Sequence, residues 1–211
     1  MGRGHVFLQG AAGGSGNLGA ANVLRAFGVA PGERFSARRI ADGQRRIAAL
    51  DLYRTVRIDT VGRRDARGAA TDTIGLAMTL AESDLRRLRT TAGWGTLDCF
   101  RATGDLTQHN FLGGAARLDL NTRVSKIGIS EPLTGAASLC PQAKADPYSR
   151  ELNYYVGASA SRPAVFHEFA PSVTLFSERR SEYNAFLRVA PIGSTLALGR
   201  MLGRVTQAFG Y

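Results

Sequence analysis

The feature that most constrains the fold is the alternation of apolar and polar side chains in the second half of the chain. From about residue 86 onward, the segments have a two-residue period and are separated by turns rich in glycine, proline and polar residues. In residues 117–125, leucine, threonine and valine alternate with arginine, aspartate, asparagine and serine. Successive side chains of a strand point to opposite faces, so the pattern predicts strands with one apolar and one polar face.

We expect six strands in this half, several of them longer than the five or six residues that are usual in a globular protein. They cover residues 88–104, 112–129, 150–162, 170–180, 183–190 and 194–210. The alternation fits both a soluble sandwich, whose apolar faces meet in a core, and a transmembrane barrel, whose apolar face meets lipid. The long strands, with no second set to cover them, favour an antiparallel transmembrane barrel.

Residues 1–84 mix helical and strand-like periods, which predicts a separate α+β module. A short strand near residues 6–8 precedes two helices, the second capped by Ser36, and two further strands follow. The helices are expected over about 18–27 and 37–50, and the strands over 52–59 and 73–80. The order is β-α-α-β-β, with both helices on one face of a small sheet. Residues 85–211 then form the strand-rich part.

Composition narrows the class of protein. The net charge of +10 comes almost entirely from arginine, because Lys126 and Lys144 are the only lysines. The arginines are spread along the chain without interleaved aromatics, which argues against a nucleic-acid partner. The sequence contains no run of eighteen apolar residues, so it does not predict a membrane-spanning helix. Cys99 and Cys140 lack a CxxC spacing, and the sequence fits a disulfide and two free thiols equally well.

A glycine-rich stretch near the N-terminus is the strongest hint of an enzyme. Gly14, Gly16 and Gly19 satisfy the G-x-G-x-x-G spacing of a loop that holds a pyrophosphate at a helix N-terminus. Such a loop needs an acidic residue at the end of the next strand, whereas Glu33 follows a Pro-Gly turn. Neither lysine has a tyrosine four residues before it, as a short-chain dehydrogenase requires. The hypothesis of a NAD(P)-binding, short-chain dehydrogenase-like enzyme depends only on the glycine-rich loop at residues 10–19. It is therefore an alternative only.

The remaining residues do not suggest catalysis. His5, His109 and His167 lie far apart and have no metal-ligand spacing, and we interpret His109 as an ordinary surface residue of a loop. There is no G-x-S-x-G elbow and no local pair of carboxylates. We expect no catalytic residue, no cofactor and no metal, so the protein is not expected to be an enzyme.

Several motifs occur in an order that resembles a known family. Pro31-Gly32-Glu33-Arg34-Phe35-Ser36 and Val56-Arg57-Ile58 look like the last part of a POTRA module, and Leu80-Ala81-Glu82 resembles its closing strand. Gly93-Trp94-Gly95-Thr96 is similar to the G-[YW]-G-T opening of the barrel in BamA/TamA-type outer-membrane assembly proteins. Asn110-Phe111-Leu112-Gly113 is similar to the entry to the second barrel strand. The chain thus resembles a fragment of this bacterial surface antigen superfamily, with one POTRA module and the first barrel strands.

The resemblance implies a component that inserts β-barrel clients into the outer membrane or exports substrates across it, with the module at 1–84 in the periplasm. Client strands would be engaged by β-augmentation at the edge of the POTRA sheet, and the first barrel strand would form a seam that can open. We place this seam strand at residues 88–104. Its candidate site residues are Gly93, Trp94, Gly95, Thr96 and Gly104, and those of the barrel entry are Asn110 and Gly113.

The implied partners are unfolded outer-membrane protein clients, outer-membrane lipids and accessory lipoproteins such as those of a BAM complex. No nucleic acid, cofactor or metal is implied. The family's barrel has about sixteen strands, and the chain offers about six, so we expect an incomplete barrel. A passive, porin-like barrel with no assembly role is a further alternative.

Overall fold

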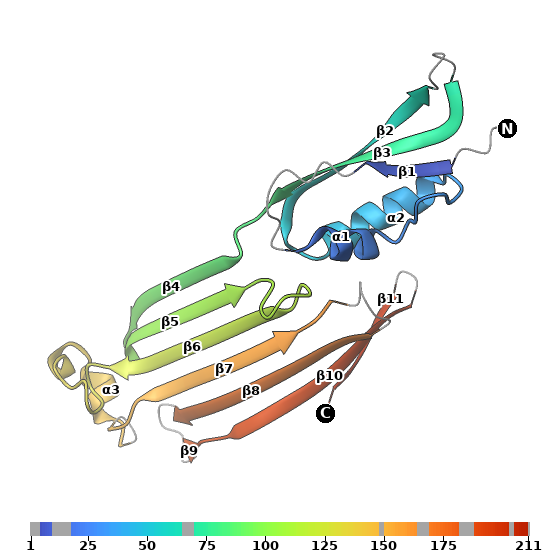
Figure 1. The fold of residues 1–211 in the computed structure, drawn as a ribbon. Coiled ribbons are helices and arrows are strands. Elements are labelled where there is room, and N and C mark those ends of the chain that lie inside the picture. Colours follow the sequence, from blue (N-terminus) through green and yellow to red (C-terminus); the bar gives the residue numbers. More distant parts are fainter. Residues whose placement is uncertain are drawn as a thin grey trace.

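The computed structural model describes residues 5–9, 18–64, 70–147, 150–163, 169–181, 188–202 and 205–210. These residues form an α/β module followed by a large open antiparallel sheet, and the module lies beside the end of the sheet where β4 begins (Figure 1). The module contains β1 (His5–Gln9), α1 (Ala20–Phe27), α2 (Ala37–Ala48), β2 (Tyr53–Arg64) and β3 (Ala70–Glu82). Its elements follow the order expected from the sequence.

The small sheet of the module has the strand order β1-β3-β2. Strand β1 runs parallel to β3, and β2 pairs with β3 in the antiparallel sense. Both helices lie on one face of this sheet (Figure 1). Phe27 of α1, Ile47 of α2 and Leu76 of β3 are almost completely buried in the core between helices and sheet. Removing such side chains from water is the main stabilising contribution in a module of this size.

Local backbone and side-chain features explain where α1 ends and where α2 begins. Gly28 adopts a left-handed conformation (φ +68°), and its N–H donates to the carbonyl of Leu24, which ends α1. Ser36 precedes α2, and its side chain accepts a hydrogen bond from the N–H of Arg39 at 3.5 Å, which confirms the expected cap. A side chain at Gly43 of α2 would lie 2.4 Å from Cδ2 of Phe27, so this glycine allows the two helices to approach closely.

The large sheet has the strand order β11-β10-β8-β7-β6-β5-β4, and β9 pairs with β8. Its strands are β4 (Arg86–Gly95), β5 (Cys99–Gln108), β6 (Arg117–Ile127), β7 (Asn153–Ser161), β8 (Phe169–Ser181), β9 (Arg188–Val189), β10 (Ile192–Leu202) and β11 (Val205–Gly210). Every pairing in it is antiparallel. The alternation in the sequence therefore correctly predicts an antiparallel sheet.

Three of the expected strand boundaries are wrong. The range 88–104 is a hairpin of β4 and β5, because residues 96–98 form a turn, and 194–210 is a hairpin of β10 and β11. The expected strand 112–129 starts only at Arg117, because residues 109–115 form turns and a bend. Of the range 183–190, residues 183–187 lie outside the described residues. Alternation continues through a tight hairpin turn, so a two-residue period alone does not reveal where one strand ends.

The strand register gives the large sheet one apolar and one polar face. Leu88, Leu106, Leu120, Ala158 and Leu175 are neighbours across five strands, and the same face carries other apolar side chains. Many of these are exposed, including Leu88 at 70%, Leu196 at 64% and Leu175 at 57%. Within the described ranges, no helix and no second sheet covers this face. The arrangement differs from a soluble sandwich, in which such a face would be buried.

Strand β4 begins close to the module, and the turn between β5 and β6 joins the two parts. Ala115 of this turn is 4% exposed and belongs to the hydrophobic core of the module. The N–H of His109 donates to the carbonyl of Leu85 at 2.7 Å, and Arg117 lies 3.9 Å from Asp51. His109 itself is 8% exposed, so its interpretation as a surface residue is wrong.

No helix in the described part of the chain is both long enough and apolar enough to cross a bilayer.

Candidate functional site

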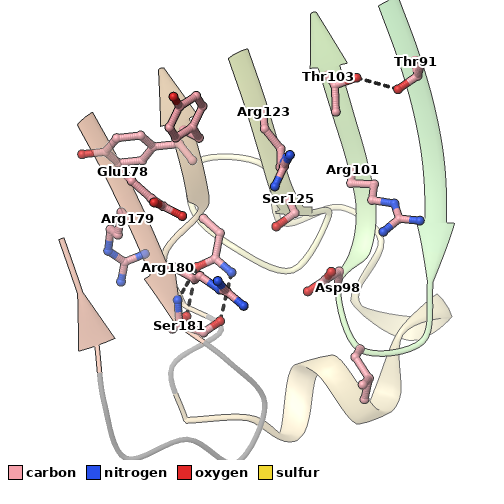
Figure 2. A pocket seen from close by; sticks show the side chains of 14 residues that line it. Thr91, Asp98, Arg101, Thr103, Arg123, Ser125, Glu178, Arg179, Arg180 and Ser181 are labelled. Carbon is pink, nitrogen blue, oxygen red and sulfur yellow. Dashed lines mark hydrogen bonds between the residues drawn. The ribbon is translucent and has the colours of Figure 1, made fainter. Parts of the chain in front are cut away.

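The candidate site is the large sheet itself, with its two contrasting faces. On the polar face, a hollow of about 790 Å³ lies at the end of the sheet away from the module. Figure 2 shows side chains from β4, β5, β6 and β8 around it. Arg101, Arg123 and Arg180 line this polar hollow together with Asp98 and Glu178. A polar, arginine-rich surface of this kind is suited to contact with water or a polar chain.

Glycines on the polar face create room for large side chains. A Cβ on Gly93 would lie 3.3 Å from Nε of Arg101, so the arginine side chain lies across the strand at this bare position. The ring of Tyr155 covers Gly157, and the ring of Phe176 covers Gly193; a Cβ at either glycine would lie 2.6 Å from the ring's end. Tyr155 and Phe176 stack with ring centroids 6.4 Å apart. Aromatic rings over strand glycines protect the exposed backbone there.

The predicted seam residues do not share one strand. Gly93, Trp94 and Gly95 end β4, Thr96 lies in the turn, and Gly104 lies on β5 opposite Thr90. Trp94 pairs with Phe100 across the hairpin on the apolar face and is 52% exposed. The Oγ1 of Thr122 donates to the carbonyl of Gly104 at 3.1 Å. The range 88–104, expected to be one seam strand, therefore spans two strands, β4 and β5.

The predicted barrel-entry residues lie in the turn that docks on the module. Asn110 has a left-handed conformation (φ +54°), and its Oδ1 accepts a hydrogen bond from the N–H of Ala115 at 3.0 Å. Gly113 also has a positive φ (+76°), which glycine adopts without steric cost. Both residues therefore shape the turn that carries Ala115 into the core of the module, and neither belongs to β6.

A disulfide bond joins Cys99 and Cys140, which the sequence left open. Both cysteines are buried, and with Ala143 they form a small apolar cluster at the end of the sheet away from the module. The bond fixes the connection between β6 and β7, which carries the short helices η1 (Ala137–Leu139) and α3 (Pro141–Ala145), to the start of β5. The sequence separation of 41 between the cysteines hides this proximity in the sequence.

A buried ion pair fixes the same connection to β6 and β8. The Nζ of Lys126 donates to Oδ2 of Asp146 at 2.9 Å and to Oγ of Ser181 at 3.0 Å. The side chains of Lys126 and Asp146 are each 1% exposed. The Nδ2 of Asn153 donates to the carbonyl of Ser181, completing a polar network. Sequence reasoning missed this network, because its members lie up to 55 residues apart and none of them forms a local motif.

In the described part of the module, the pKa of one titratable group is shifted. The pKa of Tyr53, at the start of β2, is raised by burial and by the negative charge of Glu82, which lies opposite it in the sheet. Among the described residues, no three histidine, cysteine, aspartate or glutamate side chains gather to hold a metal ion. Residues 10–17 of the glycine-rich stretch lie outside the described residues, and Glu33 forms an ion pair with Arg39 at 2.8 Å.

The open, two-faced antiparallel sheet, with an α/β module at the start of its first strand, defines the class of fold: part of an antiparallel β-barrel. No family model and no curated protein matches the sequence. Among solved structures, BamA from Haemophilus ducreyi lacking POTRA domains 1–3 is similar, with a TM-score of 0.57 at 15% identity. The alignment covers 92% of this chain and 31% of that one.

Two structures of CdiB are also similar. CdiB from Acinetobacter baumannii aligns with a TM-score of 0.58 at 14% identity, and CdiB from Escherichia coli with 0.56 at 14%. Each alignment covers 99% of this chain and 38% of the other. At this level of identity the likeness concerns the fold. The chain has a BamA/CdiB-type fold and spans between 31% and 38% of the length of these neighbours.

Proposed function

We propose that the chain is part of an outer-membrane component that assembles β-barrel clients or translocates polypeptides, and that residues 85–211 cross the membrane. The observation that carries the proposal is the two-faced sheet of BamA/CdiB-type fold. Its apolar face leaves Leu88, Leu175 and Leu196 exposed, while the other face carries the polar hollow. Lipid on the first face and water on the second satisfy both surfaces, as in a transmembrane barrel.

The distribution of aromatic side chains on the apolar face supports this placement. Trp94, Phe100 and Tyr154 lie on neighbouring rows of this face, near the end of the sheet away from the module. Their exposed fractions are 52%, 36% and 38%. Barrels of the outer membrane have aromatic girdles where the apolar band meets the head groups. We therefore place this end of the sheet at one membrane interface.

The connections between the strands suggest an orientation. At the end of the sheet away from the module, β6 and β7 are joined by residues 128–152, which contain Cys140 of the disulfide. Barrels of this kind carry their longer loops on the cell surface and shorter turns in the periplasm. The module then lies in the periplasm, and the disulfide lies in an oxidising environment, where such bonds persist.

We assign residues 1–84 as a POTRA module that receives client strands. The element order and the parallel pairing of β1 with β3 support this assignment. Strand β2, with 12 residues, lies at an edge of the sheet. An extended client can add to such an edge through main-chain hydrogen bonds, with little demand on its sequence.

Strand β4 is the corrected candidate for a seam that opens. It is the edge strand of the large sheet in the described part of the chain, and Gly93 and Gly95 lie near its end. Glycine contributes no side chain to cross-strand packing and therefore weakens pairing. A weakly paired edge can exchange partners with a client strand.

Depletion of the protein from its source bacterium tests the function. An assembly component predicts a loss of many folded barrel proteins from the outer membrane, whereas a translocation component predicts the loss of a secreted substrate with the barrel proteins unchanged. Quantitative proteomics of the outer membrane and of the medium measures both. If depletion changes neither fraction, the proposal is wrong, and the passive porin-like alternative gains support.

A further inference from the structure

We propose that residues 132–145, at the end of the sheet away from the module, form an interfacial segment that inserts into the head-group region of the membrane. This inference rests on the proposed membrane location of the sheet and concerns a different part of the chain. The segment contains η1 and α3. Its partner is the lipid surface that would surround the apolar face of the sheet.

The segment continues the apolar face of the sheet. A Cβ on Gly128 would lie 2.8 Å from Cβ of Ala136 and 3.5 Å from Cδ2 of Phe100, so Ala136 and Phe100 flank the same bare backbone position. Phe100 belongs to the apolar face, where it pairs with Trp94 on one side and Ile127 on the other. None of the described residues that line the polar hollow belongs to the segment. At Ala136, next to Phe100, the segment therefore lies beside the apolar face at the sheet's end.

The two sides of the segment have different environments. Cys140 and Ala143 are buried in the disulfide cluster, and Asp146, directly after the segment, is buried in the ion pair with Lys126. Leu133 and Leu139 do not belong to this cluster, and their exposed fractions are 50% and 60%. Two large exposed leucines on a rigidly held connection are costly in water, and burial in the membrane interface removes this cost.

The charge of the segment fits a lipid surface. Residues 132–145 contain a single ionisable side chain, Lys144, although charged residues make up 21% of the whole chain. Lys144 is exposed on α3, where its ammonium group can reach a lipid phosphate while the leucines enter the acyl boundary. The absence of a carboxylate among these residues removes the repulsion that an anionic membrane would otherwise exert.

Tryptophan quenching tests the inference, because Trp94 is the only tryptophan of the chain. The full chain is folded into vesicles of phosphatidylcholine and phosphatidylglycerol whose acyl chains carry bromine near the head group or near the middle. Emission from the unmodified protein reports on the sheet. The double variant Trp94→Phe/Leu139→Trp places the reporter on the segment. The control Trp94→Phe/Leu97→Trp places it in the turn that lines the polar hollow.

We expect Trp94 to be quenched, the tryptophan at position 139 to be quenched more strongly by shallow than by deep bromine, and the control to retain its emission. If Trp94 is quenched but position 139 is not, the interfacial segment is wrong and the membrane sheet stands. Equal quenching of the control also overturns the segment. An unquenched Trp94 overturns the proposed membrane function itself. If the variant at position 139 loses the disulfide, Leu133→Trp in the same background provides the reading.

Discussion

At the scale of single residues, the structure depends on side chains whose partners are distant in the sequence. Lys126 lies in a left-handed conformation at the end of β6 and is almost completely buried. Its ammonium group is compensated by the carboxylate of Asp146 and the hydroxyl of Ser181. A buried charge that loses its partner has neither water nor a counter-ion, and its cost is then several kcal/mol. The pair therefore holds residues 128–152 against the sheet as long as both members are present.

Substitution of Lys126 tests this role. Lys126→Ala leaves the carboxylate of Asp146 buried without its cation, and we expect the free energy of unfolding to fall by about 3–5 kcal/mol. Urea unfolding in detergent, followed by circular dichroism, measures the change. Lys144→Ala is the matched control, because Lys144 is exposed, and its effect should stay within about 0.5 kcal/mol. Equal effects of the two substitutions would show that the ion pair adds nothing.

Substitution of Gly43 gives a second test at this scale. The sign of the change in stability distinguishes a gain in helix propensity from a steric clash with α1. Replacing glycine by alanine inside a helix normally stabilises it by about 1 kcal/mol. Here the new Cβ would lie 2.6 Å from the carbonyl oxygen of Phe27, so we expect Gly43→Ala to destabilise the module by about 1–3 kcal/mol. Thermal unfolding measures the sign. Gly62→Ala, where nothing lies within 4 Å, is the control and should be nearly neutral.

At the scale of elements, the alternation along β8 separates two environments. Leu175 lies on the apolar face opposite Ala158 and Ser194, while Thr174 lies on the polar face opposite Ser159 and Thr195. In a soluble sheet with a solvated apolar face, a charge at Leu175 would have little effect, since the side chain is 57% exposed. In a bilayer, the same charge would have to enter hydrocarbon.

The pair of substitutions Leu175→Arg and Thr174→Arg tests this distinction. We expect Leu175→Arg to reduce the protein's stability in the membrane by about 2–4 kcal/mol, since arginine near the bilayer midplane is costly. Thr174→Arg should leave it nearly unchanged, because that side chain faces the polar side. The fraction of folded protein in urea titrations with lipid vesicles measures both. Similar values for the two variants would contradict a lipid-facing apolar surface.

At the scale of the whole molecule, the turn between β5 and β6 couples the module to the sheet. Ala115 reaches the module's core in a left-handed conformation, and Asn110 and Gly113 shape the turn around it. The ion pair between Arg117 and Asp51 is long, at 3.9 Å, and half exposed, so it contributes little. The apolar contact of Ala115 is therefore a stronger link between module and turn than this ion pair.

Breaking this contact should separate the two parts. We expect Ala115→Asp, which places a carboxylate in the apolar core, to undock the module and expose the connection at residues 83–85. Limited proteolysis then produces cleavage between β3 and β4, detected by mass spectrometry. Leu112→Asp is the control, since Leu112 lies in the same turn with a positive φ but is 85% exposed. Cleavage of both variants at the same rate would show that Ala115 does not hold the module.

Local patterns in the sequence were sufficient to predict the α/β module, the cap at Ser36, the antiparallel strands and the face on which each side chain lies. These features depend on neighbours within a few positions, because helix caps and strand alternation are set by short-range geometry. The turn at residues 96–98 was missed, and the loop that contains His109 was expected to end at residue 111, whereas β6 starts only at Arg117. Cys99, directly after the turn, and Ala115, in the loop, have positive φ angles. The alternation of apolar and polar residues does not reveal such backbone conformations.

Only the tertiary structure decided which distant residues meet. It paired Cys99 with Cys140, joined Lys126 to Asp146 and Ser181, and placed Ala115 in the core of the module. Each contact forms because several elements fold against one another, and its members are separated by too many residues for a local pattern to connect them. The sequence by itself determined the two chemical faces of the sheet, since strand periodicity assigns them residue by residue, and the three-dimensional packing determined the network that holds its far end together.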